Sequence, residues 1–401
     1  MVNILFLIGN GFDLNLGLKT SFRNILEEYK TANTNTEKQY LKDFIYELEK
    51  NNKNWSNFEK QLGEYTENFN IENKQIFLAQ IDSFIDAMIE KLQDEQNRID
   101  ISVRNEHIIS TLFHNSIANF QQYLPEVSRI ALSPFLDTSK RNKNFNYNFI
   151  SFNYTKTFER LLSVVEDRAK QKSLRFIKTG NEQQAINDII GNVLHIHGTL
   201  DRDFILGIDN KNQIKNKELA EDEEIQSLIK PYQNSLIGEN KEQKAKQLID
   251  KSKIICIYGM SLGETDKTWW VYIYKWLIAD SSRHLVIFFY NKNLNIKKPR
   301  SKISHKNNVY KLLFSHIDNI NEFDIDHVKE RIHIAFQNMF NIDILDKPVS
   351  TFRKTPLFSD PLLTFKTLSK LTSTGVDFSK FDKAVRQVNQ ASEALKKTGL
   401  F

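Results

Sequence analysis

Fifteen residues near the start of the chain read Asn3-Ile-Leu-Phe-Leu-Ile-Gly-Asn-Gly-Phe-Asp-Leu-Asn-Leu-Gly17. Their apolar first part predicts a buried strand of a parallel sheet. Gly9 and Gly11 predict a tight turn, and residues 14–29 hold enough apolar side chains to continue as a helix. A strand, a glycine turn and a helix in this order present backbone N–H groups to an anion. The same pattern also forms ordinary turns, so phosphate binding and a plain strand-to-helix turn both stay open.

Three later stretches place polar residues directly after apolar runs. They read Ser151-Phe-Asn-Tyr-Thr155, His195-Ile-His-Gly-Thr-Leu200 and Tyr258-Gly-Met-Ser-Leu-Gly-Glu-Thr-Asp266. In an open parallel sheet the carboxyl ends of the strands share one edge, where ligands bind. We therefore expect four polar strand ends to converge on one crevice.

The composition predicts a folded globular protein, because 40% of the 401 residues are hydrophobic and 29 are Phe. The net charge of +5 permits an acidic ligand without requiring nucleic acid. The single cysteine, Cys256, excludes an internal disulfide framework, and its apolar surroundings indicate a core residue. The first apolar run is too short for a secretion signal and no run is long enough to cross a membrane. We therefore expect a cytoplasmic protein that does not enter a membrane.

Residues 21–136 predict a large helical subdomain inserted after the first strand and helix. Phe77, Ile81, Phe84 and Met88 recur at spacings of three and four, and we interpret this stripe as core. Later apolar runs predict strands at residues 149–152, 192–196, 253–258, 284–290 and 309–314, and helices at 155–164, 266–279 and 326–339. Strands that alternate with helices predict an α/β fold with a mainly parallel sheet.

Four polar segments complete the domain organisation. Residues 140–148 predict a linker, and residues 215–247 a charged, helix-prone lid or second insertion. Residues 292–311 hold seven Lys or Arg and no acid, for which a solvated loop is favoured over a nucleic-acid patch. Residues 347–401 differ in sequence pattern from the α/β domain of residues 1–346, because they hold short apolar clusters among Ser, Thr and Lys. We interpret them as a C-terminal extension or oligomerisation element.

The first stretch carries a resemblance to a known family. Residues 5–22, Leu-Phe-Leu-Ile-Gly-Asn-Gly-Phe-Asp-Leu-Asn-Leu-Gly-Leu-Lys-Thr-Ser-Phe, resemble the N-terminal signature of the AbiH family of bacterial abortive-infection, anti-phage proteins. The three later stretches fit that family in order and spacing. The resemblance spans residues 1–340, and it implies a role in defence against phage.

The glycine turn is also similar to the NAD loop of sirtuins and of sirtuin-like defence NAD-hydrolases, which reads Gly-Ala-Gly-Ile-Ser. Ser151-Phe-Asn-Tyr resembles their Thr-x-Asn segment, and His197 with Gly198 resembles their His-Gly pair. This second resemblance implies a Rossmann-like core that cleaves the nicotinamide–ribose bond of NAD, with Asn153 and His197 catalytic. The residues that it implies for NAD binding are Gly9, Asn10, Gly11, Asp13, Gly17, Thr155, Gly198, Gly259, Ser261 and Asp266.

The chain departs from the sirtuin pattern at three points. Thr155 stands where that family has an acid, and Asp13 stands where it has a serine. A carboxylate beside a phosphate is unfavourable unless it faces sugar hydroxyls. The zinc ribbon is missing, which argues against a protein deacylase. These departures put the hydrolytic activity in question more than the fold.

The residue types suit cleavage of an N-glycosidic bond. The carboxamide of Asn153 can hold water or a ribose hydroxyl by donating and accepting at once. A carboxylate at that position could instead attack C1′. His197 is suited to take a proton from a hydroxyl group or from water near neutral pH.

Simpler interpretations exist for the same side chains. Asn153 could cap a helix that starts at Tyr154, and Asp266 could cap the helix after it. His195 and His197 share one face of a strand, which suits a metal pair completed by Asp209, Asp13 or Asp266. No recognisable metal arrangement is present, and we expect His195 to be a hydrogen-bonded strand residue.

The leading hypothesis is an anti-phage effector that binds and hydrolyses NAD and needs no metal. One alternative is a nucleotide-binding sensor or interaction module without turnover, responding to a phage-derived trigger. Another is a metal-dependent nuclease or phosphohydrolase that uses His195, His197 and nearby Asp. A homo-oligomer is compatible with all three, and the sequence leaves the trigger open.

Overall fold

A computed structural model of the protein describes residues 1–32, 46, 58–99, 101, 103–136, 144–168, 176–179, 182–185, 188–317 and 322–340. The chain separates into two compact units, Met1–Asp346 and Lys347–Phe401. All described residues belong to the first unit. The predicted extension of residues 347–401 therefore lies outside the described residues.

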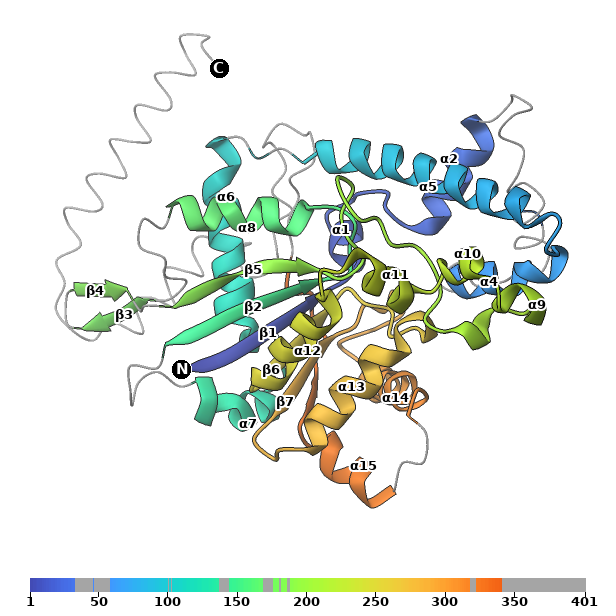
Figure 1. The fold of residues 1–401 in the computed structure, drawn as a ribbon. Helices are drawn as coiled ribbons and strands as arrows, with labels where there is room; N and C mark the ends of the chain where they lie inside the picture. The colour runs from blue at the N-terminus through green and yellow to red at the C-terminus, as the bar shows by residue number, and fades with distance from the viewer. Residues whose placement is uncertain are drawn as a thin grey trace, which may run out of the picture. The chain divides into compact units, whose positions relative to one another are not determined.

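A six-stranded parallel sheet forms the centre of the first unit (Figure 1). In chain order its strands are β1 (Val2–Ile8), β2 (Phe145–Ser151), β5 (Ile189–His195), β6 (Ile254–Tyr258), β7 (His284–Phe288) and β8 (Ile332–Ile334). Their order across the sheet is β5-β2-β1-β6-β7-β8. The direction of progression reverses between β1 and β6, as in doubly wound α/β sheets. A separate antiparallel pair consists of β3 (Phe176–Thr179) and β4 (Glu182–Ala185).

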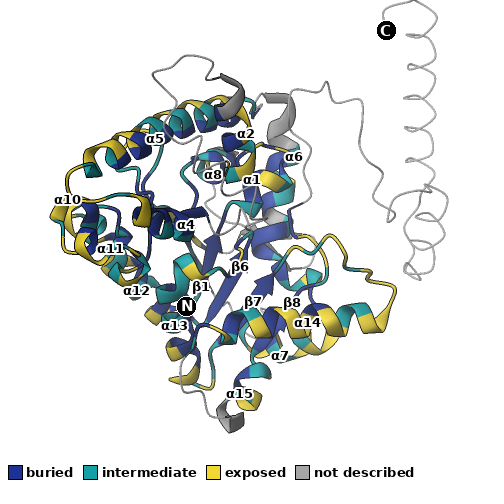
Figure 2. Cartoon of the chain, turned by 90° about the vertical axis from the view of Figure 1, so that its right-hand side faces the viewer, coloured by how far each residue is buried: buried dark blue, intermediate teal, exposed yellow. Residues whose placement is uncertain are grey.

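Two hydrophobic cores lie on the two faces of this sheet, because successive strand side chains point in opposite directions. On β1, Ile4, Phe6 and Ile8 enter the first core, whereas Leu5 and Leu7 enter the second. The first core is covered by helices α6 (Val103–Phe113), α7 (Glu126–Leu136) and α8 (Thr157–Arg168). The second is covered by α12 (Lys241–Lys251), α13 (Lys267–Ile278), α14 (Pro299–Phe314) and α15 (Glu322–Lys329). Coverage of both faces explains why β6 and β7 are buried along their whole length (Figure 2).

The inserted helical region has a core of its own. Its described helices are α2 (Phe22–Ala32), α4 (Phe58–Tyr65) and α5 (Lys74–Asn97), linked by the 3₁₀ turn η3 (Thr66–Asn68). The predicted stripe of Phe77, Ile81, Phe84 and Met88 is buried in this core, which confirms its interpretation. A π-helical turn η4 (His114–Ala118) and a 3₁₀ turn η5 (Phe120–Tyr123) follow α6.

The charged excursion after β5 packs onto the inserted region. It contains η6 (Lys211–Gln213), α9 (Lys217–Ala220), α10 (Glu223–Gln226) and α11 (Lys230–Ile237). Ile208, Leu219 and Ile225 join the same core as Phe58 and Phe77. The two segments are separated in sequence by β2, α8 and β5, and they form one packed body.

The solvated loop expected at residues 292–311 is wrong from Pro299 onward, where α14 begins, and four other predicted elements also differ from the structure. The helix expected at residues 14–29 is divided into α1 (Gly11–Asn15) and α2, because Gly17 adopts a positive φ of 85° between them. The linker expected at 140–148 is already strand from Phe145. The strand expected at 309–314 is wrong, since these residues end α14. The helix expected at 326–339 is wrong beyond Lys329, because β8 follows.

No described helix of this protein is sufficiently long and apolar to span a lipid bilayer.

Candidate functional site

The four polar strand ends lie level with one another at the carboxyl edge of the sheet. Ile8 of β1 is in register with Ser151 of β2 and with Tyr258 of β6, and Ser151 is in register with His195 of β5. The loops that follow these strands therefore begin at the same height. The reversal between β1 and β6 falls inside this group, which is where open α/β sheets bind their ligands.

The glycines after β1 allow its turn to pack directly against the turn after β6. Gly9 N–H donates to Tyr258 O at 2.9 Å, and Gly11 N–H donates to Gly259 O at 2.7 Å. A Cβ atom at Gly11 would lie 2.5 Å from Gly259 Cα, which no side chain tolerates. Both N–H groups are thus donated to protein carbonyls, and the observed role of the two glycines is close backbone packing.

Asn10 and Gly17 shape the segment between α1 and α2. The Asn10 side chain accepts from Thr20 Oγ1 at 2.6 Å and donates to Thr20 O at 2.9 Å. Gly17 reverses the chain with its positive φ. These contacts hold the turn in place, and the Asn10 amide is engaged with Thr20.

Asp13 is buried beneath this turn, with 1% of its surface exposed. Thr155 Oγ1, from the loop after β2, donates to Asp13 Oδ2 at 2.5 Å. Asp13 Oδ1 has no hydrogen-bond partner among the described residues. Burial raises the pKa of Asp13 to about 7, although the hydroxyls of Thr155 and Thr157, which both face the carboxyl group, oppose the shift. The carboxyl group is consequently shared between its neutral and charged forms near neutral pH.

Asn153 is the most unusual side chain at this edge. It is 4% exposed, and within the described part of the chain neither Oδ1 nor Nδ2 has a hydrogen-bond partner. It does not cap a helix, since α8 begins only at Thr157. Its backbone is fixed by contrast, because Asn153 N donates to Ser151 Oγ at 3.2 Å and Asn153 O contacts His195 Nδ1 at 2.9 Å. A fixed backbone therefore holds a buried carboxamide whose own groups are unpaired.

His195 is a structural residue, as the sequence predicts. Its Nε2 lies 2.5 Å from Glu159 Oε2, while its Nδ1 faces the carbonyl of Asn153. The imidazole thus links β5 to the start of α8 and supports the loop that carries Asn153.

His197 lies between the aromatic rings on either side of Asn153. Its ring centroid is 5.5 Å from that of Phe152 and 6.2 Å from that of Tyr154. Burial and, to a smaller extent, the positive charge of Lys230 together lower the pKa of His197 to about 4, although Asp266 opposes the shift. His197 is therefore neutral at physiological pH and has a lone pair available.

A buried ion network extends from His197 towards the helical region. Asp266 Oδ1 is 3.8 Å from His197 Nε2 and 3.5 Å from Lys230 Nζ. Lys230 Nζ in turn is 3.0 Å from Glu59 Oε2. Burial alone lowers the pKa of Lys230, but the charges of Glu59 and Asp266 outweigh it and raise that pKa above its usual value. The network joins α4, α11 and the loop after β6.

The remaining predicted residues have different surroundings. Gly198 adopts a φ of 73°, and a Cβ there would lie 1.6 Å from Asp203 O, so this glycine serves a tight turn. Gly259 faces the turn after β1. Ser261 is exposed. Asp266 occupies the N-cap position directly before α13 but makes no capping hydrogen bond, since its carboxylate faces Lys230 and His197.

No group of three or more His, Cys, Asp or Glu among the described residues is arranged to hold a metal ion. Asp209 is instead bonded to Thr268, whose Oγ1 lies 2.9 Å from Asp209 Oδ2. His195 and His197 have different partners, Glu159 for the first and Asp266 for the second.

Sequence reasoning missed Glu59 and Lys230. They are 171 positions apart, and each lies in a segment rich in other charged residues. The one local signal is that each follows an apolar residue at the start of a helix, Phe58 before Glu59 and Ile229 before Lys230.

The comparison with known families identifies the chain. The model of the family described as Bacteriophage abortive infection AbiH matches residues 5–289. No curated protein matches the chain. The family match covers well over half of the chain and includes β1, β2, β5, β6 and β7 with all four strand ends. The chain therefore belongs to the AbiH family of bacteriophage abortive-infection proteins.

Proposed function

We propose that this AbiH-family protein is an anti-phage effector that binds NAD at the carboxyl edge of its sheet and hydrolyses the nicotinamide–ribose bond. Family membership indicates abortive infection as the biological role. Loss of NAD would stop the growth of phage and host together, which is the outcome that abortive infection requires. The single observation that carries the chemical part is the buried, unpaired carboxamide of Asn153.

The unpaired groups fit the sugar of a nucleotide. Buried polar atoms without partners cost about 1–3 kcal/mol each, so a ligand that pairs them recovers this energy. Asn153 offers one acceptor and two donor hydrogens, and Asp13 offers a free oxygen that donates when protonated. Ribose hydroxyls both donate and accept. The raised pKa of Asp13 also reduces its repulsion of a nearby phosphate.

The strand order supports a dinucleotide as the ligand. The order β5-β2-β1-β6-β7-β8 is that of sheets in which a dinucleotide lies across the reversal point. Gly9 and Gly11 keep side chains away from this point, although their own N–H groups are bonded to Tyr258 and Gly259. The side-chain directions of both glycines are filled by Gly259 and Met260, so in the proposal their role is to hold the two turns together at the reversal point.

The reaction requires one water molecule. Water adds its oxygen to C1′ of the ribose as the bond from C1′ to the pyridinium nitrogen breaks, and the electron pair of that bond neutralises the nicotinamide ring. The products are ADP-ribose and nicotinamide, and one proton is left over. Neutral His197 accepts this proton from the water and passes it to solvent, while the carboxamide of Asn153 holds the water or a ribose hydroxyl. Asp266, 3.8 Å from His197 Nε2, stabilises the imidazolium.

The test measures NAD consumption and nicotinamide release by the purified protein and its variants. His197→Ala is expected to lower turnover by about 10²–10⁴-fold, the usual contribution of a general base. Asn153→Ala is expected to lower it by about 10²–10³-fold, the usual cost of losing one preorganised hydrogen-bonding group. His327→Ala changes an exposed histidine of α15 and serves as the matched control. Addition of EDTA distinguishes this reaction from the metal-dependent alternative.

Two results would contradict the proposal. One is turnover at the wild-type rate in both variants. The other is full protection against phage in cells that carry either variant, with no NAD turnover by the wild-type protein. The second result, combined with measurable NAD binding, would identify a nucleotide sensor instead.

A further inference from the structure

Residues 292–311 concentrate the positive charge of the protein. They carry Lys292, Lys297, Lys298, Arg300, Lys302, Lys306 and Lys311 and no acidic residue. Since the whole chain has a net charge of only +5, the rest of the chain is net negative. The segment begins directly after the residues matched to the AbiH family, so the family match assigns it no role.

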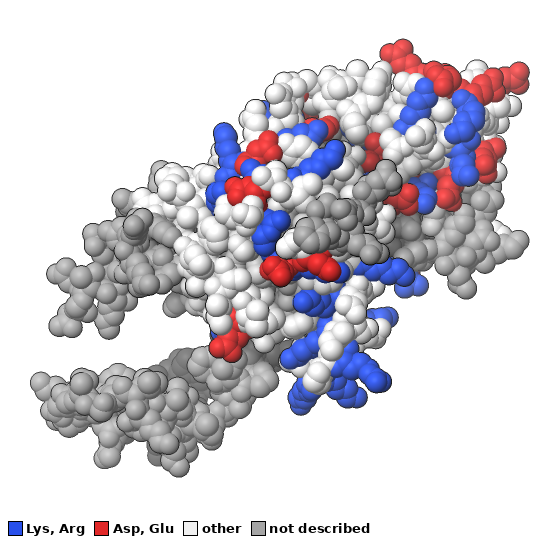
Figure 3. All heavy atoms as spheres, turned by 90° about the horizontal axis from the view of Figure 1, so that it is seen from below, with Lys and Arg blue, Asp and Glu red and all other residues white. Residues whose placement is uncertain are grey.

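In the structure this segment consists of an exposed loop followed by a helix, and not of a loop alone. Residues 299–314 form α14, and six of the seven cations are exposed, Lys302 being half-buried. The loop that leads into α14 is exposed and stands out from the body of the protein (Figure 2). Lysine and arginine side chains gather on a projecting part of the surface seen from below (Figure 3).

These cations have no protein counter-ions in the described part of the chain. Not one of the seven forms an ion pair with a described carboxylate. Lysines elsewhere on the surface do form such pairs, for example Lys253 with Asp280. Lys306 lies over the ring of Tyr310 at 5.5 Å and Lys302 over that of Phe336 at 5.7 Å. Mutual repulsion among seven uncompensated cations favours a polyanionic partner.

The form of the segment distinguishes a nucleic acid from a membrane. A helix that lies on a membrane needs a free apolar face. The apolar face of α14, with Val309, Tyr310 and Leu313, is already buried in the second core of the sheet. Ile303 is 61% exposed, but one apolar residue among exposed cations does not make the apolar face that a membrane-bound helix needs. Tyr290, at the start of the exposed loop, is 84% exposed, and a ring of this kind next to cations is a stacking platform for an unpaired base.

We propose that Tyr290 and residues 292–311 form a surface that binds single-stranded nucleic acid through its phosphates and one stacked base. The surface follows the carboxyl end of β7, so it lies at the same edge of the sheet as the candidate NAD site. It is independent of NAD turnover, because none of its residues belongs to the strand ends that carry Asn153 and His197.

The experiment measures binding of a fluorescein-labelled 20-nucleotide oligo(dT) to the full-length protein by anisotropy, over a range of salt concentrations. Replacement of Lys297, Lys298 and Arg300 by Gln together should weaken binding at low salt by at least about tenfold. It should also reduce the slope of log K against log[salt] by about 2, since each phosphate contact on a single strand contributes about 0.7. Tyr290→Ala should weaken binding by roughly 5- to 100-fold at an unchanged slope, because stacking involves no counter-ion.

The matched control removes the same charge elsewhere. Lys215, Lys217 and Lys244 are exposed and form no ion pair with a described residue, and their triple replacement by Gln should leave binding nearly unchanged. If both triple variants weakened oligonucleotide binding equally, the loss would depend only on the net charge of the protein, and the proposal would be overturned. Tighter binding to a 20-base-pair duplex, or to vesicles of phosphatidylglycerol and phosphatidylcholine, than to the oligonucleotide would also overturn it. Thermal unfolding of each variant checks that it is folded.

Discussion

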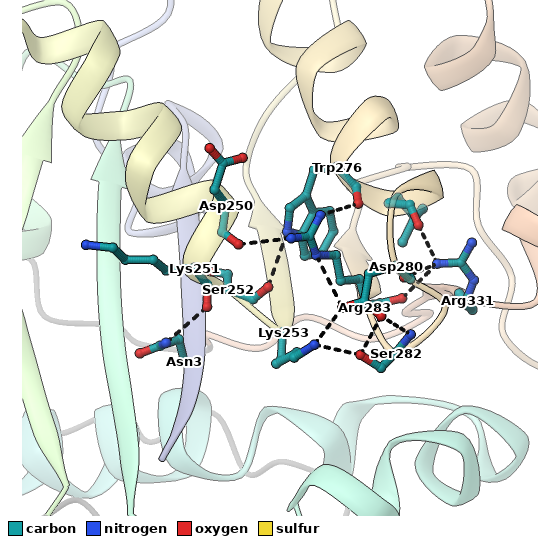
Figure 4. Close-up of polar contacts among 11 residues, drawn as sticks. Asn3, Asp250, Lys251, Ser252, Lys253, Trp276, Asp280, Ser282, Arg283 and Arg331 are labelled. Atoms are coloured by element: carbon teal, nitrogen blue, oxygen red, sulfur yellow. Dashed lines mark hydrogen bonds and ion pairs between the residues drawn. The ribbon is translucent and has the colours of Figure 1, made fainter.

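The two edges of the central sheet treat their polar groups in opposite ways. At the amino edge, Arg331 Nη1 donates to the carbonyls of Leu277, Asp280 and Arg283 at 2.5–3.2 Å. Lys253 Nζ donates to the carboxylate of Asp280 and to the hydroxyl of Ser282, both at 2.7 Å (Figure 4). These contacts tie the starts of β6, β7 and β8 to the loops before them, and they lower the pKa of Asp280 through the hydrogen bonds from Lys253 and Ser282.

At the carboxyl edge, buried groups are left without partners. Within the part of the chain that the structure describes, Asn153 has two side-chain atoms without a hydrogen-bond partner and Asp13 has one, although both residues are almost completely buried. Native proteins pair the large majority of such atoms, so a group of exceptions in one place calls for a reason. The amino edge has one such atom among the described residues, Arg283 Nε, and the carboxylate of Asp280 lies 3.9 Å from it. The difference teaches that polar groups at the amino edge mainly stabilise the fold, whereas Asn153 at the carboxyl edge keeps an unfavourable burial that a ligand would relieve.

Replacement of the buried Lys230 should have the largest effect on stability and tests this contrast. Lys230→Met leaves Glu59 and Asp266 buried without their cation, and it should lower the free energy of unfolding by about 3–5 kcal/mol. Arg331→Met at the amino edge should cost less, about 1.5–3 kcal/mol, because its acceptors are uncharged carbonyls. Urea unfolding of the two variants measures both values.

A double variant checks the cause of the effect. Adding Glu59→Gln to Lys230→Met removes one of the two stranded charges and should recover part of the lost stability. If Lys230→Met proves no more costly than Arg331→Met, the network is not a buried ion network in solution.

The titration of Asp13 should make the free energy of unfolding depend on pH. The pKa of Asp13 is about 7 in the folded chain, whereas an unfolded aspartate titrates near 3.8. Between these values the folded state binds one more proton than the unfolded state, so the stability contributed by Asp13 falls as the pH rises from about 4 to about 7. Asp13→Asn removes this titration. Its unfolding free energy relative to wild type should increase by roughly 2–3 kcal/mol from pH 5 to pH 7.

The comparison with the wild-type protein at each pH cancels the other titrating groups. His197, His284 and His333 have pKa values lowered to about 4 by burial, and their contributions act in the opposite direction, being lost as the pH falls. They are unchanged in Asp13→Asn. A difference between the two proteins that stays constant from pH 5 to pH 7 would show that Asp13 titrates normally.

Parts of this organisation can be predicted from the sequence because they depend on local patterns. Continuous apolar runs identify β1, β6 and β7, since strands buried on both faces need no alternation. The four polar strand ends follow from these runs and the parallel topology. Cys256 is buried in β6, as its surroundings indicate.

Other parts cannot be predicted because they depend on distant contacts. Val309 and Leu313 mark the buried face of α14, but six apolar-rich residues at the end of a basic segment fit a strand equally well. The three residues of β8 are too few to carry a pattern. Nothing near Glu59 or Lys230 reveals their pairing, and the unpaired state of Asn153 follows only from its three-dimensional surroundings.

The smallest predicted effect is also the most specific. Asn153→Ala should leave the free energy of unfolding unchanged or raise it by about 1 kcal/mol, because the removed side chain makes no hydrogen bond to any described residue and its burial is unfavourable. Asn216→Ala is the matched control. Asn216 accepts from Glu218 N and Leu219 N at the start of α9 and donates to Phe69 O at 2.6 Å, so its loss should cost about 1–2 kcal/mol.

The sign of this difference decides between a structural and a functional Asn153. A structural asparagine would lose stability on truncation, as Asn216 does. An asparagine kept for a ligand should gain or keep stability while it loses NAD binding, since the ligand supplies the partners that the protein lacks. Thermal unfolding of both variants, with and without NAD, measures this directly. A loss of stability in Asn153→Ala equal to that in Asn216→Ala would remove the main observation behind the proposed site.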